Sequence, residues 1–296
     1  MPVKILAGLP VKKMLAAEGI FTMDKERASK QDIRPLKFAI VNLMPKKIET
    51  ELQLLRLISQ SPLQIEVDFV QMASHQAKNI SASYLETFYL TFPEMKENYY
   101  DGLIITGAPV EKLPFEAVDY WQELEEIMAW SQSHVTSNLH ICWGAQAGLY
   151  HHYQVEKTNY QEKVFGIFEN QIQEDDRLIR GFSDCFFSPQ SRYTGVNATQ
   201  IAEQPLKIVA NHPELGPLIL VSEDRKNVFV LGHLEYDTDT LEQEYLRDKA
   251  KGLATRAPVN YYQTGNEIKN SWRSEACLFY HNWVNEVYQR TPYEWV

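Results

Sequence analysis

A nearly continuous apolar run, LKFAIVNLM at residues 36–44, constrains the fold more than any other stretch of this sequence. A strand without polar alternation is buried on both faces, as strands are in parallel sheets covered by helices. Two further short apolar runs occur at 100–109 (YDGLIITGAP) and 138–143 (NLHICW), and each leads into a segment with helical spacing. This alternation predicts right-handed crossovers and an α/β fold, a mostly parallel sheet with helices on both faces.

The elements around this core follow from the same periodicities. PLQIEVDFV at 62–70 alternates strictly and predicts a half-exposed strand near a sheet edge. Helices are expected at 48–59, around 115–133, at 144–153, at 238–251 with Asp237 or Thr238 as N-cap, and at 275–288. After residue 160, shorter strands are expected at 163–170, 217–224 and 226–233, with a hairpin loop at 223–227 and an irregular segment at 252–272.

No change in composition demands a second domain. We therefore predict that residues 1–296 form a single domain, with a core at about 36–250 and the C-terminal helix packed on it.

Composition excludes several classes of function. The formal net charge of −10 argues against a nucleic-acid partner, because phosphate contacts need clustered Lys and Arg. No stretch approaches the length of a membrane span, and the N-terminal residues lack the apolar run of a signal peptide. The 3 cysteines are widely spaced without a CxxC pair, so reduced thiols and a cytoplasmic location are expected.

Cys142 is the candidate nucleophile. It stands between a predicted strand and a predicted helix, where the helix dipole favours a thiolate. Gly144 and the small residues after it suit a tight strand–nucleophile–helix turn, whereas His140 departs from the small residue usual at that position. A buried structural thiol is the competing interpretation, and the residues alone leave the two about even. Cys185 and Cys277 lack this setting and are expected to be packing residues.

A cysteine nucleophile needs a base, and two His-x-Glu sequences compete for that role. His212 and Glu214 are followed by a turn-like ELGP, whereas His233 and Glu235 follow a cleaner buried strand. Gly232 is expected to let the chain turn at the carboxyl end of that strand, which is the edge where sites form in open α/β sheets. The second pair has the better physical case. No spacing typical of metal ligands appears.

Together these features resemble the homoserine O-acyltransferases of methionine biosynthesis, the MetA type, over nearly the whole chain. The matching segments are NLMPKKIETELQLLRL (42–57), DGLIITGAPVE (101–111), HVTSNLHICWGAQAGL (134–149), GF with PQSRYT (181–194), GHLEYD (232–237) and SWRS (271–274). The resemblance implies a flavodoxin-like fold similar to class I glutamine amidotransferases. It also implies a triad in which Cys142 accepts the acyl group, His233 is the general base and Glu235 orients the imidazole.

The same resemblance assigns further site residues. It places the substrate contacts on Lys163, Ser191 and Arg247, and a guanidinium suits the α-carboxylate of an amino acid. An oxyanion hole would use the backbone N–H of Trp143 and another near Ala108 in the TGAP loop.

Position 111 bears on the acyl group. Members of this family with Glu here transfer acetyl, whereas those that transfer succinyl tend to have a small residue, so Glu111 implies acetyl-CoA as donor. A carboxylate there would repel and crowd the free carboxylate of a succinyl group. Two departures from the family pattern, Leu234 between His and Glu and Gln190 before the Ser-Arg pair, remove no triad group.

The expected function is thus a homoserine O-acetyltransferase that works by a ping-pong reaction, with acetyl-CoA and L-homoserine as partners and neither a cofactor nor a metal. A homodimer is compatible with the resemblance. Three alternatives stay open: succinyl-CoA as donor, a glutaminase that shares the triad, and a non-catalytic protein that uses Cys142 as a redox sensor.

Overall fold

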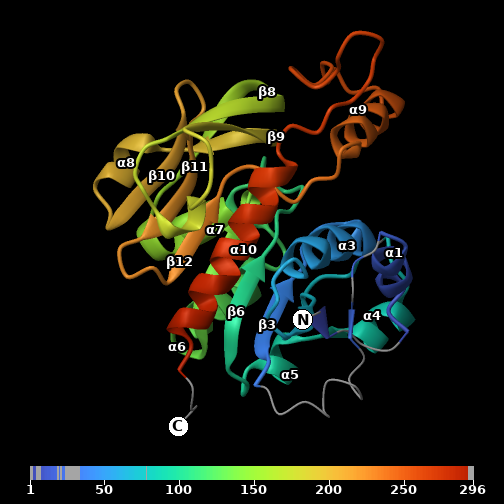
Figure 1. The fold of residues 1–296 in the computed structure, drawn as a ribbon, viewed down its shortest axis with the longest axis vertical. Helices are drawn as coiled ribbons and strands as arrows, with labels where there is room; N and C mark the ends of the chain where they lie inside the picture. Colours follow the sequence, from blue (N-terminus) through green and yellow to red (C-terminus); the bar gives the residue numbers. More distant parts are fainter. Residues whose placement is uncertain are drawn as a thin grey trace.

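In a computed structural model, which describes residues 3–4, 8–18, 20, 22–23, 34–77 and 79–292, a 12-stranded sheet organises the chain. One half of the sheet is parallel, in the order β2-β1-β4-β3-β6-β7-β12 (Figure 1). Its strands are β1 (Val3–Lys4), β2 (Thr22–Met23), β3 (Leu36–Val41), β4 (Ile65–Val70), β6 (Tyr100–Ile105), β7 (Val135–Ile141) and β12 (Asn227–Val230), with the short β5 (Tyr89–Leu90) paired to β4. The expected parallel α/β sheet is confirmed.

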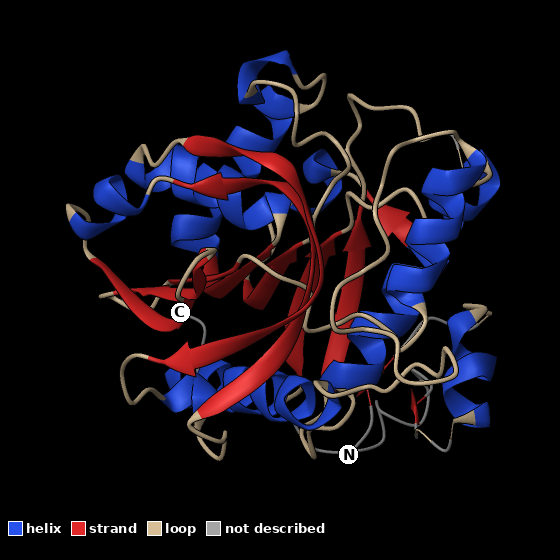
Figure 2. Ribbon diagram, turned by 90° about the horizontal axis from the view of Figure 1, so that it is seen from above, coloured by secondary structure: helices blue, strands red, loops and turns tan. Residues whose placement is uncertain are grey.

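The other half of the sheet is antiparallel and continues from β12 in the order β11-β10-β8-β9. It consists of β8 (Lys157–Ile172), β9 (Cys185–Val196), β10 (Leu206–His212) and β11 (Gly216–Ser222). Two of its strands are long and strongly curved in the view from above (Figure 2). The hairpin loop expected at 223–227 joins β11 to β12, as predicted.

Helices cover both faces of the parallel half because successive residues of its strands point to opposite sides. Phe38 and Ile40 of β3 pack toward α3 (Lys47–Ile58) and α10 (Arg273–Arg290), which crosses the sheet beside β6 (Figure 1). Ala39 and Val41 pack on the opposite side toward α6 (Trp121–His134) and α7 (Trp143–Tyr153).

The remaining helices are short or peripheral. They are α1 (Val11–Ala17), α4 (Ala82–Phe88), α5 (Phe92–Met95), α8 (Ala198–Ala202), α9 (Thr240–Ala250) and the 3-10 turns η1 (Phe115–Ala117) and η2 (Arg177–Ile179). The irregular segment that follows α9 approaches β8 through a bridge between Gly166 and Val259 (Figure 1). A Cβ on Gly166 would lie 2.3 Å from the Val259 carbonyl oxygen, so only glycine permits this approach.

Several expectations about individual elements were wrong. The helix expected around 115–133 begins only at Trp121, because Pro114 and the 3-10 turn interrupt the chain before it. The helix expected at 238–251 begins at Thr240 after Asp239, which makes no side-chain capping bond, so neither Asp237 nor Thr238 is the N-cap. The strand predicted at 163–170 lies within the longer β8, and β9 and β10 were not predicted.

Candidate active site

Three neighbouring parallel strands end at one edge of the sheet. β6 leads to Gly107, β7 to Cys142 and β12 to His233. Because parallel strands place their carboxyl ends together, residues distant in sequence converge there. A Cβ on Gly107 would lie 3.7 Å from the Cys142 Sγ and 3.6 Å from the His233 Cε1 atom, so the three residues are packed against one another.

Cys142 stands on a strained turn at the start of α7. Its backbone has φ 52° and ψ −116°, a region that non-glycine residues rarely adopt, and its amide donates to the Val230 carbonyl at 2.7 Å. Gly144 allows the helix to start against β6, since a Cβ there would lie 2.7 Å from the Ile105 carbonyl oxygen. The side chain of Cys142 is thus fixed at the N-terminus of a helix, as expected of a nucleophile on such a turn.

His233 and Glu235 form a buried pair beside this cysteine. The His233 Nδ1 and Glu235 Oε1 atoms are 2.6 Å apart, and the two side chains are 4% and 8% exposed. Burial alone would lower the pKa of His233, but the negative charges of Cys142 and Glu235, and hydrogen bonds to both, raise it well above its ordinary value. The arrangement stabilises the imidazolium form of His233.

Gly232 has a different role from the one that the sequence indicated. The φ angle of Gly232 is not positive, so the turn of the chain there does not require a glycine. A Cβ at Gly232 would instead lie 3.0 Å from the Pro189 carbonyl oxygen and 2.6 Å from the Gln190 side chain. The same Pro189 carbonyl accepts the His233 amide at 3.0 Å. Glycine is required because β9 passes directly against the histidine loop and holds it.

The competing pair, His212 and Glu214, lies in the turn between β10 and β11. The His212 Nδ1 atom accepts the amides of Glu214 at 3.1 Å and Leu215 at 3.2 Å, so this histidine stabilises its own turn. The expectation of a turn at this site is confirmed.

A cavity of about 590 Å³ opens over Cys142 and His233. It is also lined by a cluster of charged and polar groups that come from the antiparallel half of the sheet and from α9. They are Lys163, Ser191, Glu244, Arg247 and Asp248. The structure therefore brings the three residues expected to contact substrate into one cavity with the cysteine and the histidine.

The cluster is held by a chain of direct bonds. Ser191 donates to the Glu244 Oε2 atom, and the Lys163 ammonium lies 3.7 Å from the same oxygen and 3.3 Å from Asp248 Oδ2. Arg247 donates to Asp248 Oδ1 through Nε at 3.0 Å and Nη2 at 2.8 Å. Lys163 lies in the irregular stretch between Asn159 and Val164 where β8 shifts register against β9, which turns it toward the cavity.

Glu111 lines the same cavity, in the loop after β6. Its Oε2 atom accepts the Tyr193 amide at 2.8 Å and lies 3.4 Å from the Thr194 hydroxyl, so the carboxylate ties this loop to β9. Burial raises the pKa of Glu111, against the opposing effects of the Tyr193 amide and the Lys163 charge.

The two residues expected to form an oxyanion hole differ in how they meet the cavity. Ala108 lines it, and Trp143 begins α7 directly after the cysteine. Across the described ranges, neither backbone N–H donates to a backbone carbonyl. The Trp143 side chain is buried against Phe115, Tyr120 and Trp121 and therefore serves packing.

The two other cysteines differ in exposure. Cys277 is half-buried in α10, whereas Cys185 is exposed on β9, so the expectation that Cys185 is a packing residue was wrong. Strand alternation places Cys185 outward and Phe186 inward.

Within the described residues, no group of three or more His, Cys, Asp and Glu is arranged to hold a metal ion. No helix in that part of the chain is long and apolar enough to cross a membrane.

Two residues that line the cavity, Tyr236 and Asp248, were not predicted from the sequence. The Tyr236 ring stacks on the His233 imidazole with centroids 4.0 Å apart, and its hydroxyl donates to Glu244 Oε1 at 2.8 Å. Asp248 is 4% exposed and bonds both cationic side chains of the cluster. The only available signal for either was proximity in sequence to His233 or to Arg247.

Comparison with solved structures defines the fold class. Glutamine amidotransferases from Thermotoga maritima and Methylobacillus flagellatus have TM-scores of 0.54 and 0.52 with this chain at 14% and 11% identity, and cover 86% and 90% of it and 99% of their own lengths. The chain is thus an α/β protein of the class I glutamine amidotransferase-like fold, as expected.

Sequence comparison then identifies the family. The profile of the homoserine O-succinyltransferase family matches residues 2–293. A homoserine O-acetyltransferase of Bacillus subtilis (strain 168) is 51% identical over 300 residues, 100% of both chains. Another, from Lactococcus lactis subsp. cremoris (strain MG1363), is 52% identical over 299 residues, 99% of this chain and 94% of that one. The chain belongs to the homoserine O-succinyltransferase family.

Proposed function

We propose that this protein is a homoserine O-acetyltransferase, which moves an acetyl group from acetyl-CoA to the γ-hydroxyl of L-homoserine in methionine biosynthesis. The observation that carries the proposal is a single cavity that is lined by Cys142 and His233 and by a compact charged cluster. The names of the relatives, which are homoserine O-acetyltransferases over the full length, support it.

In the first half-reaction, the Cys142 sulfur attacks the thioester carbonyl carbon of the donor. His233 holds the proton of the thiol and delivers it to the departing CoA sulfur, so that an acetyl thioester remains on Cys142. Glu235 stabilises the imidazolium that exists between these two proton transfers. The amides of Trp143 and Ala108 are the proposed donors to the oxyanion.

In the second half-reaction, homoserine occupies the charged cluster. Its α-carboxylate suits the Arg247 guanidinium and the Lys163 ammonium, and its α-ammonium suits the Glu244 carboxylate. His233 takes the proton of the γ-hydroxyl, which attacks the acetyl thioester and releases Cys142. A hydroxyl is a poor nucleophile at neutral pH, so this general base should contribute about 10²–10⁴-fold.

Glu111 favours acetyl over succinyl as the acyl group. It lines the cavity that holds Cys142, and its carboxylate is fixed by the Tyr193 amide. A succinyl group would bring a second carboxylate into this cavity. Both the repulsion between like charges, on the order of 1–4 kcal/mol at ~4 Å, and the volume that Glu111 occupies oppose it.

The test compares acetyl-CoA and succinyl-CoA as donors to L-homoserine, in the wild type and in Glu111→Gly. We expect the wild type to prefer acetyl-CoA and the variant to gain activity with succinyl-CoA. Incubation with acetyl-CoA alone should leave an acetyl group on Cys142, detected by mass spectrometry of the intact protein. A wild type that prefers succinyl-CoA would overturn the choice of donor, and the absence of any acyl-enzyme would overturn the mechanism.

A further inference from the structure

The cavity over Cys142 is lined by more cations than carboxylates, although the chain as a whole has a formal net charge of −10. Its charged lining consists of the cations Lys46, Lys112, Lys163, Arg247 and Lys251 and the carboxylates Glu111, Glu244 and Asp248. Lys163 and Arg247 are paired with the carboxylates of α9. The positive charge in excess therefore lies on the three other lysines, and such a local excess attracts anions.

These three lysines belong to the exposed part of the lining. Their side chains are exposed, whereas Cys142 and His233 are only 7% and 3% exposed. The cavity thus has a buried end at the cysteine and the histidine and an exposed rim that includes the lysines. Leu113 and Leu253, which are 45% and 51% exposed, belong to the same rim.

Lys112 is held in place without being neutralised. Its ammonium lies 3.7 Å from the centroid of the Tyr193 ring, which also lines the cavity. The loop that carries it is fixed by Lys157, which donates to the carbonyls of Glu111 at 2.9 Å and Leu113 at 2.5 Å. Across the described ranges, Lys112 forms no ion pair, so its ammonium can still bind an anion.

Lys251 and Lys46 extend the positive rim along α9. Gln243, Arg247 and Lys251 are spaced by four residues and therefore share one face of this helix and its end. Lys46 donates to the Gln243 Oε1 atom at 3.2 Å and pairs with Glu49 at 2.9 Å. Lys251, like Lys112, forms no ion pair within the part of the chain that the structure describes.

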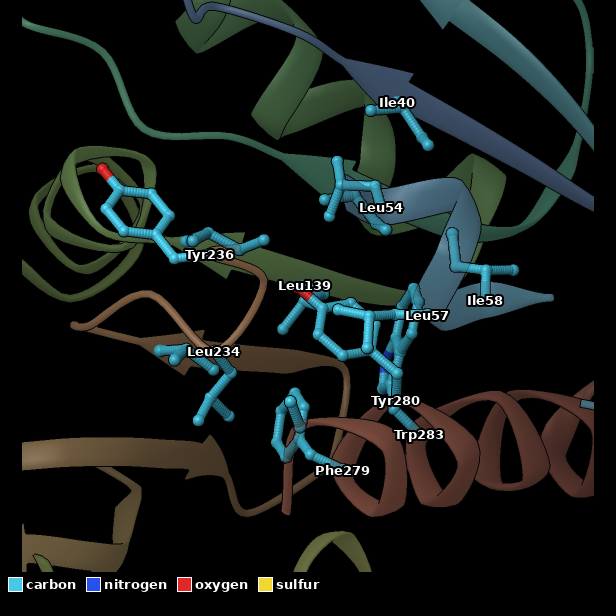
Figure 3. Packing of buried hydrophobic residues seen from close by; sticks show 14 of the residues in the cluster. Ile40, Leu54, Leu57, Ile58, Leu139, Leu234, Tyr236, Phe279, Tyr280 and Trp283 are labelled. Carbon is cyan, nitrogen blue, oxygen red and sulfur yellow. The ribbon is translucent and has the colours of Figure 1, made fainter. Parts of the chain in front are cut away.

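The helices that carry these two lysines are fixed to the core and to each other. Leu54, Leu57 and Ile58 of α3 are buried beside α10 (Figure 3). Gln53 of α3 donates to the Thr240 hydroxyl at the start of α9 at 3.1 Å. The two sides of the rim therefore keep their spacing, as a preformed site requires.

Acyl-CoA has its reactive group and its charged groups at opposite ends. The proposed reaction places the thioester at the Cys142 sulfur, at the buried end of the cavity. The pantetheine arm, which joins the thioester to the nucleotide, is slender and uncharged, so it suits apolar lining side chains such as Met44 and Val110. The nucleotide and its phosphate groups then extend to the exposed rim, where ammonium groups can donate to them.

We propose that Lys112 and Lys251 bind the phosphate groups of the CoA nucleotide and so form the anion subsite of the acyl donor. Leu113 and Leu253, close to them in sequence, provide apolar contact for the rest of the nucleotide. Lys46 adds positive charge to the rim, although Glu49 and Gln243 already engage it. The assignment rests on the proposed function in that the donor is an acyl-CoA, and it is the same for either acyl group.

The test compares two donors that differ only in the nucleotide, acetyl-CoA and S-acetylpantetheine. In Lys112→Ala and in Lys251→Ala, we expect KM for acetyl-CoA to rise about fivefold, and in the double variant about 25-fold, as for exposed ion pairs at independent sites. KM for S-acetylpantetheine and kcat should not change. Lys249→Ala is the matched control, because Lys249 is an exposed lysine of α9 that does not line the cavity, and it should behave as the wild type.

A binding measurement separates this subsite from the acetyl transfer itself. Calorimetry with CoA and with pantetheine, under reducing conditions and without homoserine, requires no reaction. The double variant should bind CoA about 25-fold more weakly than the wild type and pantetheine equally well. Added salt should weaken the binding of CoA to the wild type more than to the double variant, because exposed charges are screened.

Several outcomes would overturn the proposal. They are an unchanged KM and Kd for CoA in the double variant, an equal loss with both donors, a rise in KM for homoserine alone, or no binding of CoA to the wild type. Lysine-dependent binding of CoA by a protein that transfers no acetyl group would contradict the proposed function and leave the subsite in place. Acetyl transfer with an unchanged KM for acetyl-CoA in the double variant would contradict the subsite alone.

Discussion

Both halves of the sheet contribute side chains to the lining of the cavity, and they hold these side chains in different ways. The parallel half presents Cys142 and His233 at the ends of adjacent strands, where backbone bonds fix them. The antiparallel half and α9 present Lys163, Ser191 and Arg247, which are held mainly by bonds between side chains. The groups proposed to react are thus held by backbone bonds at the ends of strands, and the groups proposed to bind substrate are held by a charge network.

This difference predicts that substitutions in the two regions change different kinetic constants. Changes in the parallel half should lower kcat, because they alter groups that act in the transition state. Changes in the charge network should raise KM for homoserine, because they alter groups that hold the substrate throughout the reaction.

The largest effect is expected for Cys142→Ala. Loss of the nucleophile should lower turnover by about 10⁴-fold or more, as removal of a triad member does in other enzymes. The thermal midpoint should stay within about 2 °C, since alanine fits the same space. Steady-state rates with acetyl-CoA and homoserine provide the measurement. Cys185→Ala is the matched control, because that cysteine is exposed, and it should have wild-type activity.

Glu235→Gln should have the next largest effect. An amide cannot stabilise the imidazolium, so kcat should fall by about 10²–10³-fold. Because the Glu235 charge raises the pKa of His233, its removal lowers that pKa, and the acid limb of the kcat/KM profile should move to lower pH.

The control for this variant is Glu214→Gln in the competing His-x-Glu sequence. It should change neither the rate nor the pH profile, because His212 caps its own turn. A large loss in Glu214→Gln with little loss in Glu235→Gln would reverse the assignment of the base.

The parallel half, and the proximity of Cys142 and His233 at its edge, were predictable from the sequence, because both depend on local patterns. Continuous apolar runs identify buried parallel strands, and the carboxyl ends of such strands are where Cys142 and His233 were expected to meet. The preference for His233 over His212 as the base rested on the same reasoning, and the turn at His212 follows from Pro213.

The antiparallel half was much less predictable. β9 has the sequence CFFSPQSRYTGV, which contains a proline and shows no clean alternation of polar and apolar residues. Its position depends on pairing with β8 and on contact with Gly232. The need for glycine at 232 could not be derived either, because the backbone that crowds it belongs to a strand more than forty residues earlier. Asp248 and Tyr236 have roles set by tertiary contacts alone.

A third prediction concerns acid stability, through His140 in the parallel half. The side chain is fully buried, and its ring stacks on Phe229 with centroids 4.9 Å apart. Burial, with a smaller effect of His152, lowers the pKa of His140 to about 3. The unfolded chain, with an ordinary histidine pKa, takes up a proton below about pH 6.5 that the folded state does not.

The free energy of unfolding should therefore fall as the pH drops from 7 to 4.5, with a His140 contribution of about 2–3 kcal/mol. His140→Leu should show a shallower decline in urea midpoint over this range, and a midpoint at pH 7 near that of the wild type. His281→Leu, at an exposed site on α10, is the control and should follow the wild type. Identical slopes in all three proteins would mean that His140 does not resist protonation.

The smallest effect is expected in the charge network, for Arg247→Lys. Asp248 fixes the guanidinium through two bonds, and lysine keeps the charge but lacks the planar fork that grips a carboxylate. KM for homoserine should rise about tenfold while kcat changes less than about twofold. Lys249→Ala, two residues further along α9 and not among the residues that line the cavity, should leave both constants unchanged. A fall in kcat at constant KM would instead place Arg247 among the groups that act in the transition state. That result would contradict the expectation that the charge network affects only KM.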